Sequence, residues 1–277
     1  MLLAIGCGAP QTVINAAAAQ GAKVITLPAY PRLGAPVSSH ADLLIHPLGG
    51  ALYTFGDYYR SFAEEEINRI CDGAGLELRF IGADAGSVYP ADVPLCAKRV
   101  GDFFLVSRAT APELCDAAAG LGLHVITTKQ GYTACSAAAA GCGIITSDTG
   151  IACAASKAGI PRLVISPGSI DLPGYGYGFI GGSCAFCAER GEVWLTGDPM
   201  THPDGESIAA FIRSCGALPR ALTPGRLYDC GGMFFSNDDR IKFPAPHHAM
   251  RSRAFYLKST LSPPTTFPLL SVNLTSA

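Results

Sequence analysis

The sequence predicts a five-bladed α/β propeller, because it contains an internal repeat, glycine-terminated helices and glycine-centred hairpins. In each copy of the repeat, an apolar helical stretch ends at a glycine and a short β-branched strand follows. The five copies span residues 13–27, 64–81, 112–127, 151–166 and 207–222. One helix with a small sheet cannot bury its apolar faces alone, whereas five such units arranged in a ring can.

The glycine of each copy is expected to end its helix in the left-handed conformation, which costs a glycine nothing. These residues are Gly21, Gly75, Gly122, Gly159 and Gly216. Between the copies we expect hairpins with Gly-rich turns, pairing 43–46 with 51–55, 93–97 with 103–107, 133–139 with 144–147, 182–188 with 193–196, and 227–230 with 233–236. Asp148 and Asp204 are placed to cap the fourth and fifth helices.

The amino-acid composition indicates the domain organisation, the kinds of partner and the cellular compartment to expect. The chain has 277 residues, 49% hydrophobic and 15% charged, which favours a single globular domain over 1–242, followed by a loosely ordered Pro/Ser/Thr-rich tail over 243–277. A net charge of −2 favours neither nucleic acid nor a membrane surface as partner. The 11 cysteines, an odd number, are typical of free thiols in a reducing compartment, and we expect a cytoplasmic protein.

Several segments carry a family resemblance. They are Lys129-Gln-Gly-Tyr132, residues 145–150, the Gly-rich run 166–182, His40-Ala-Asp42 and Gly197-Asp198. With the five-unit repeat, they resemble the pentein fold of the guanidine-modifying enzymes, which include arginine deiminase, agmatine deiminase, dimethylargininase and the amidinotransferases. More closely, the chain resembles a bacterial family assigned to that guanidine-modifying-enzyme (GME) fold. The resemblance covers about residues 1–240.

The resemblance implies where a catalytic site would lie. In those enzymes the fifth hairpin supplies a thiolate that attacks the guanidinium carbon, the third supplies a His, and carboxylates hold the cation. Cys230 stands near the thiol position here, and the alternative is an ordinary small buried cysteine. The third hairpin has no His, so His46, in the first hairpin, is the candidate base. Residues 95–97, where the resemblance places an acid, have none. The usual deiminase mechanism is therefore not expected, because an unpaired buried guanidinium is costly.

Other residues could hold a ligand. Lys129 and Tyr132 open the third hairpin and could reach the central channel. Asp171 and Tyr177 lie in the Gly-rich run 166–182, where the backbone can approach a ligand closely. The alternative is that this run is only a linker between blades.

Neither a cofactor nor a metal is predicted. Gly6-Cys-Gly8 follows a strand, as in a dinucleotide-binding loop, but Gln11 replaces the third glycine and no acid follows the next strand. Cys184 and Cys187 have CxxC spacing without a second ligand pair. The oligomeric state is left open.

Two functional hypotheses follow. In the first, the protein is a catalytically silent or non-standard pentein that binds a small molecule; in the second, it is a divergent Cys-dependent hydrolase or deiminase-like enzyme acting on an amidine or amide, with Cys230 attacking and His46 assisting. We favour the first, because most of the expected catalytic groups are absent.

Overall fold

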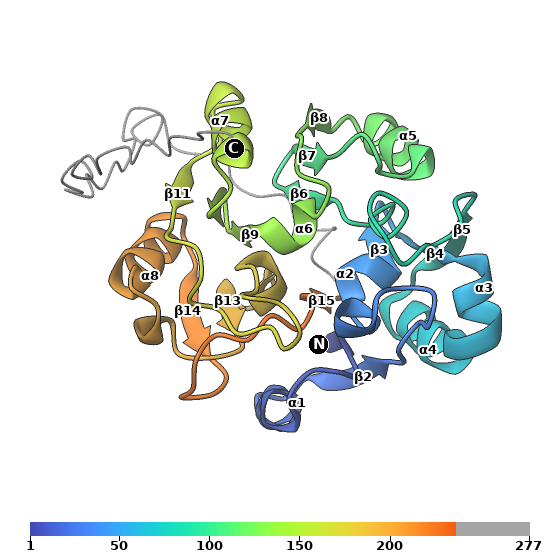
Figure 1. The fold of residues 1–277 in the computed structure, drawn as a ribbon, viewed down its shortest axis with the longest axis horizontal. Coiled ribbons are helices and arrows are strands. Elements are labelled where there is room, and N and C mark those ends of the chain that lie inside the picture. Colours follow the sequence, from blue (N-terminus) through green and yellow to red (C-terminus); the bar gives the residue numbers. More distant parts are fainter. Residues whose placement is uncertain (237–277) are drawn as a thin grey trace, which may run out of the picture.

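The computed structural model describes residues 1–236 and contains five three-stranded sheets set around a common centre (Figure 1). Written from the inner to the outer strand, the sheets are β15 (Met233–Phe235), β1 (Leu2–Gly6), β2 (Lys23–Leu27); β3 (Ile45–Leu48), β4 (Ala51–Phe55), β5 (Glu77–Ile81); β6 (Lys98–Val100), β7 (Phe103–Val106), β8 (His124–Thr127); β9 (Ala137–Ala140), β10 (Gly143–Thr146), β11 (Arg162–Val164); and β12 (Cys184–Cys187), β13 (Glu192–Leu195), β14 (Leu218–Ala221). The predicted five-bladed α/β architecture is confirmed.

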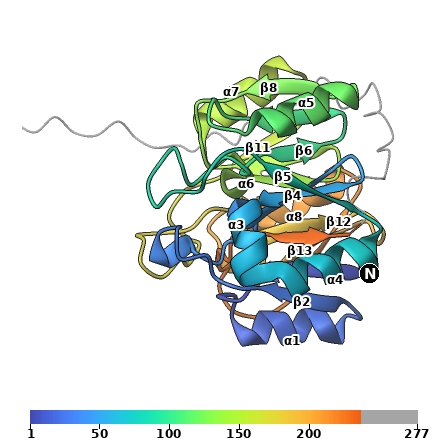
Figure 2. The same ribbon diagram turned by 90° about the vertical axis from the view of Figure 1, so that its right-hand side faces the viewer.

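Every blade has the same internal pattern. The inner strand pairs antiparallel with the middle strand, and the middle strand pairs parallel with the outer strand after a helical crossover. The crossover helices are α1 (Gln11–Ala19), α3 (Gly56–Tyr58) and α4 (Glu64–Ala74) joined by a π-helical turn (Tyr59–Ala63), α5 (Pro112–Gly120), α7 (Thr149–Lys157) and α8 (Gly205–Ser214). They lie on the outside of the ring, as the side view shows for α4 and α5 (Figure 2).

Short helical segments lie nearer the centre, just before inner strands. They are α2 (Ala41–Leu44) before β3, α6 (Thr133–Ser136) before β9, and the 3-10 turn Gly181–Ser183 before β12; two further 3-10 turns span Ala35–Val37 and Pro199–Thr201. Two of these segments, one directly after His40 and one containing Cys135, thus lie where inner strands begin.

The local signals of the repeat are confirmed. All five predicted glycines have positive φ, between 62° at Gly75 and 85° at Gly21. Asp148 caps α7 by accepting a hydrogen bond from the Ile151 amide at 2.8 Å. Asp204 also precedes its helix, but its carboxylate accepts from the Ser166 amide instead, so the predicted cap at α8 is wrong.

The fifth predicted hairpin is wrong. Residues 227–230 form no strand with β15; instead β15 pairs with β1, so that Leu3 lies opposite Phe235 and Ile5 opposite Met233. The last blade is thus built from both ends of the described chain. The other four predicted inner strands all begin later than expected. Residues 93–97 form no strand and precede β6, and the first residues of the predicted runs 43–46, 133–139 and 182–188 are helical and precede β3, β9 and β12. The predicted tail, 243–277, lies outside the described residues.

Burial falls from the middle strands to the outer ones. All five residues of β1 and of β4 are buried, whereas β5 and β14 are mostly exposed or half-buried. Within residues 1–236 no helix is long and apolar enough to cross a membrane.

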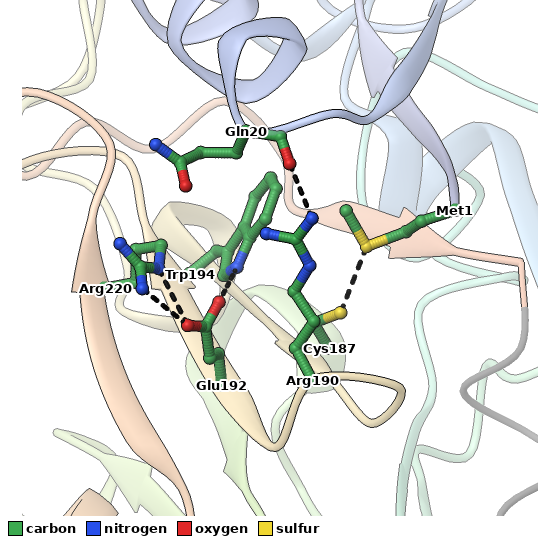
Figure 3. Close-up of polar contacts among 7 residues, drawn as sticks. All are labelled: Met1, Gln20, Cys187, Arg190, Glu192, Trp194 and Arg220. Carbon is green, nitrogen blue, oxygen red and sulfur yellow. Dashed lines mark hydrogen bonds and ion pairs between the residues drawn. The ribbon is translucent and has the colours of Figure 1, made fainter.

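A group of polar contacts joins strands β13 and β14 of one blade and links that blade to the one that contains β1 (Figure 3). The buried Trp194 indole donates to Glu192 at 2.8 Å, and Arg220 donates twice to the same carboxylate, at 2.7 and 2.9 Å. Arg190 lies over the Trp194 ring and donates to the Gln20 carbonyl after α1, at 2.6 Å. The contacts of Glu192 therefore lie within one blade, and the bond from Arg190 crosses to the other.

Replacing Glu192 by Gln should lower the free energy of unfolding by roughly 1 kcal/mol at pH 7, since charge-assisted hydrogen bonds to a half-exposed Arg220 are lost. The hydrogen bonds from Arg220 hold the pKa of Glu192 below its ordinary value. The stabilisation is therefore present above about pH 4 and disappears as the pH falls through the folded-state pKa.

Urea unfolding of both proteins at pH 7, and at the lowest pH at which they stay folded, measures how much free energy of unfolding the substitution removes. The matched control is Glu189→Gln, which removes the same charge from an exposed position in the neighbouring turn. An equal loss of unfolding free energy in both variants would show that the hydrogen bonds of Glu192 contribute nothing specific.

Candidate functional site

Acids and thiols converge where the inner strands begin. A short segment precedes each inner strand. These segments carry Asp42, Cys96, Cys135, Ser183, and Asp229 with Cys230, and Cys184 is the first residue of β12. The Cys96 and Cys135 sulfurs lie 3.8 Å apart. The folded ring therefore gathers ionisable groups from all five blades.

A cavity of about 340 Å³ opens over this cluster. Its floor includes His40, Cys135 and Asp229, and three tyrosines stand in its walls. The remaining lining is Val37, Gln130, Leu172, Gly176 and Phe179, and the tyrosines are Tyr132, Tyr175 and Tyr177. A cavity of this size and mixed lining is typical of a site for a small molecule.

Asp229 is almost fully buried, with 1% of its surface exposed. Its carboxylate accepts hydrogen bonds from the Phe179 amide at 2.8 Å and the Gly231 amide at 3.0 Å. Burial raises its pKa, while the nearby His40 acts in the opposite direction. No Lys or Arg among residues 1–236 forms an ion pair with it.

His40, Asp42 and Cys135 form a second buried group beside Asp229. One potential ligand atom from each lies within 4.8 Å of the other two. Burial lowers the pKa of His40, so its imidazole is neutral at pH 7. Burial also raises the pKa of Asp42 to about 7, and the charge of Asp229 adds to that rise. Within the described part of the chain, neither Asp42 oxygen has a hydrogen-bond partner of normal geometry, although the Cys135 thiol is near enough to oppose the rise in the pKa of Asp42.

Cys230 lines a smaller adjoining cavity of about 170 Å³. His40 and Asp229 border this space as well as the main cavity, so the two cavities meet at these side chains. The Cys230 thiol is buried and points toward the Gly182 carbonyl at 3.5 Å. Burial raises its pKa, and the charge of Asp229 adds to the effect.

His46 lies elsewhere, in a space of about 90 Å³ lined by residues of all five inner strands. Its Nδ1 lies 3.1 Å from the Leu95 carbonyl, and burial lowers its pKa to about 3. His46 and Cys230 share none of these cavities. The structure therefore does not bring the two predicted catalytic residues to one cavity.

Two of the four predicted ligand-binding residues line the main cavity. Tyr132 does so with its hydroxyl bonded to the buried Asp92, and Tyr177 does so from the Gly-rich run. Lys129 is exposed, and its neighbour Gln130 lines the cavity instead. Asp171 forms an ion pair with Arg226 at 2.9 Å, outside the cavity lining.

The sequence reading missed His40, Asp42, Cys135 and Asp229 as site residues. A signal was present, because His40-Ala-Asp42 belongs to the segments that carry the family resemblance. Cys135 and Asp229 each lie two to four residues before an inner strand. Comparing those positions across the five repeats would have singled them out.

Two glycines allow the backbone to approach these side chains. A Cβ on Gly182 would fall 1.8 Å from the Asp229 carboxylate, and a Cβ on Gly231 would fall 2.2 Å from Cβ of His40. Gly231 also has a φ of 75°. The floor of the site thus depends on glycine at both positions.

Replacing Gly182 by Ala should destabilise the fold by about 2 kcal/mol or more, because Asp229 must move from its two backbone donors. Gly176→Ala is the matched control, since its Cβ would meet nothing within 4 Å and it lies in the cavity wall. Chemical unfolding measures both; similar stabilities for the two variants would contradict the placement of Asp229.

Several solved structures are similar to this chain at low sequence identity. Two structures of dimethylarginine dimethylaminohydrolase match with TM-scores of 0.49 and 0.48, at 12% and 11% identity; the first is an adduct with S-methyl-L-thiocitrulline, and the second, from Pseudomonas aeruginosa, is a complex with citrulline. Each match covers 79% of this chain and 91% of the other. An amidinotransferase of saxitoxin biosynthesis from Microseira wollei matches with a TM-score of 0.46 and 10% identity, over 84% of this chain and 93% of its own.

No curated protein matches the sequence. A family model described as a family of unknown function, DUF6873, matches residues 4–234. This range includes part or all of every strand of the five blades, and it includes His40, Asp42, Cys135, Asp229 and Cys230. The chain therefore belongs to the DUF6873 family.

Proposed function

We propose that the protein binds a small planar organic cation of the amidine or guanidine class in the tyrosine-walled cavity. The observation that carries this proposal is the buried Asp229 carboxylate on the cavity floor, which has no ion-pair partner in the described chain. A buried carboxylate without a counter-charge is costly, and a bound cation would remove that cost.

The charges around the floor favour a cation over an anion. Asp42 adds a second acidic group near Asp229, and His40 supplies no positive charge at pH 7 because burial lowers its pKa. A cation bound beside Asp229 would also lower the pKa of that carboxyl toward its ordinary range. Binding and ionisation would thus support each other.

The walls favour a planar group. Tyr132, Tyr175 and Tyr177 surround the cavity, and aromatic faces attract cations as well as other flat groups. The bond from Tyr132 to Asp92 holds that ring in place before a ligand arrives. Tyr175 and Tyr177 are about half exposed, so they form the outer part of the wall.

Benzamidine and benzamide are a matched pair of probes, since they share a planar shape and differ in charge. We expect benzamidine to raise the melting temperature and benzamide to have little effect, because only the cation pairs with Asp229. Isothermal titration should give an affinity for benzamidine at least tenfold higher. Asp229→Asn should abolish the difference, whereas Asp171→Asn, at an exposed position outside the cavity, should preserve it. Equal binding of the two probes would contradict the proposal.

Thiol-dependent hydrolysis of an amidine or amide is the second candidate. The observation that favours it is the smaller cavity, where Cys230 lies with His40 and Asp229. In this arrangement the Cys230 sulfur attacks the amidine or amide carbon and its proton passes to His40, in place of the expected His46, while Asp229 stabilises the imidazolium that forms. The carbon–nitrogen bond then breaks as the departing nitrogen takes that proton from His40. Water attacks the resulting thioimidate or thioester, which releases the product and restores the Cys230 thiol. The raised pKa of Cys230 requires the bound cation to activate the thiol.

Thiol labelling at pH 7 tests this candidate. Without ligand, Cys230 should react at least tenfold more slowly with iodoacetamide than the exposed Cys7 and Cys153, because it is buried and protonated. A reactive amidine such as 2-chloroacetamidine should modify Cys230 first, as site-resolved mass spectrometry would report. Modification of Cys7 and Cys153 ahead of Cys230 by the amidine would remove the hydrolase candidate and leave cation binding intact.

A further inference from the structure

We propose that His40, Asp42 and Cys135 form a binding site for Zn²⁺, with the open coordination position facing the tyrosine-walled cavity. This inference uses a different carboxylate from the organic cation proposed above, although His40 and Cys135 border the same cavity. His40 cannot accept the Cys230 proton through the nitrogen that binds the metal, so the metal-bound form is an alternative to the hydrolase candidate. It also departs from the prediction of no metal, which considered only ligand pairs close in sequence.

The three side chains already lie close together. One ligand atom from each residue lies within 4.8 Å of the others. All three residues are buried, with 4% of the surface exposed at His40, 2% at Asp42 and 3% at Cys135. In tetrahedral zinc sites with N, O and S ligands, bond lengths near 2.0–2.3 Å place ligand atoms roughly 3.3–3.8 Å apart. An inward movement of about 1 Å would therefore complete the site.

The unpaired atoms point to a missing cation. Nδ1 of His40 and both oxygens of Asp42 are fully buried and have no hydrogen-bond partner of normal geometry within residues 1–236. Leaving three such atoms unsatisfied in one place is rare in folded proteins, since each is costly. A metal ion accepts electron pairs from the imidazole nitrogen and the carboxylate at once.

The donor set selects the metal. A nitrogen, an oxygen and a sulfur together suit Zn²⁺, whereas Mg²⁺ and Ca²⁺ require oxygen ligands. Cys135 would bind as the thiolate and release its proton to solvent. The thiolate and the Asp42 carboxylate then balance the two charges of the ion, and Asp229 keeps its own charge for a cationic ligand.

The fourth position is set by the cavity. His40 and Cys135 both line the tyrosine-walled cavity, so a metal held between them faces that space. Three protein ligands with one open position distinguish zinc sites that bind a water or a ligand from closed structural sites. The site would thus place a polarising cation at the base of the cavity.

Metal titration of the untagged full chain tests the site directly. After chelator treatment under reducing conditions, Co²⁺ should bind with a stoichiometry near one and produce the intense near-ultraviolet absorption of a cobalt–thiolate bond. Zn²⁺ should displace Co²⁺ and bleach this band. Cys135→Ser should abolish the band, and Asp42→Asn should keep the band while weakening Zn²⁺ affinity at least tenfold in a chelator competition.

Three controls separate this site from others. Cys187→Ser removes the CxxC pair, Cys153→Ser removes an exposed thiol, and His247→Gln with His248→Gln removes adjacent histidines outside the described residues. All three should bind metal as the unmodified protein does. Absence of a cobalt–thiolate band in the folded wild-type protein, or its persistence in Cys135→Ser, would overturn the proposal. Should Cys135→Ser fail to fold, unchanged Zn²⁺ affinity in Asp42→Asn would overturn it equally. Neither result affects benzamidine binding to the metal-free protein.

Discussion

The pairing of β15 with β1 is the interaction on which the rest of the structure depends. Every other blade takes its inner and middle strands from one hairpin, but this blade joins strands from opposite ends of the described chain. The pairing closes the ring, and closure brings the segment before β15, with Asp229 and Cys230, against His40. The site exists because the ring is closed.

Features encoded locally could be predicted from the sequence, and features that depend on closure could not. The helix-ending glycines, such as Gly75 and Gly216, act within a few residues, and their positive φ values follow from local sequence. The partner of β15 lies near the other end of the chain, and no short-range pattern identifies it. An apolar run after Gly231-Gly232 was therefore assigned to the wrong neighbour.

The same reasoning explains the candidate site. Cys230 lines a cavity that also has His40 in its wall, whereas His46 lines a different one. His46 lies only six residues beyond His40, yet it falls within β3 and faces a different part of the channel. Whether a residue lies before an inner strand or within it decides which cavity it reaches, and that boundary is poorly defined by sequence alone.

The closure of the ring also couples ligand binding at the site to the stability of the closed ring. Because Asp229 and Cys230 come from the last segment before β15 and His40 comes from the segment before β3, a ligand that contacts both sides binds only the closed form. By linkage, such a ligand strengthens the β15–β1 pairing by its own binding free energy. Occupancy of the cavity and protection of the β1 and β15 amides from hydrogen exchange should rise together, although the ligand touches neither strand.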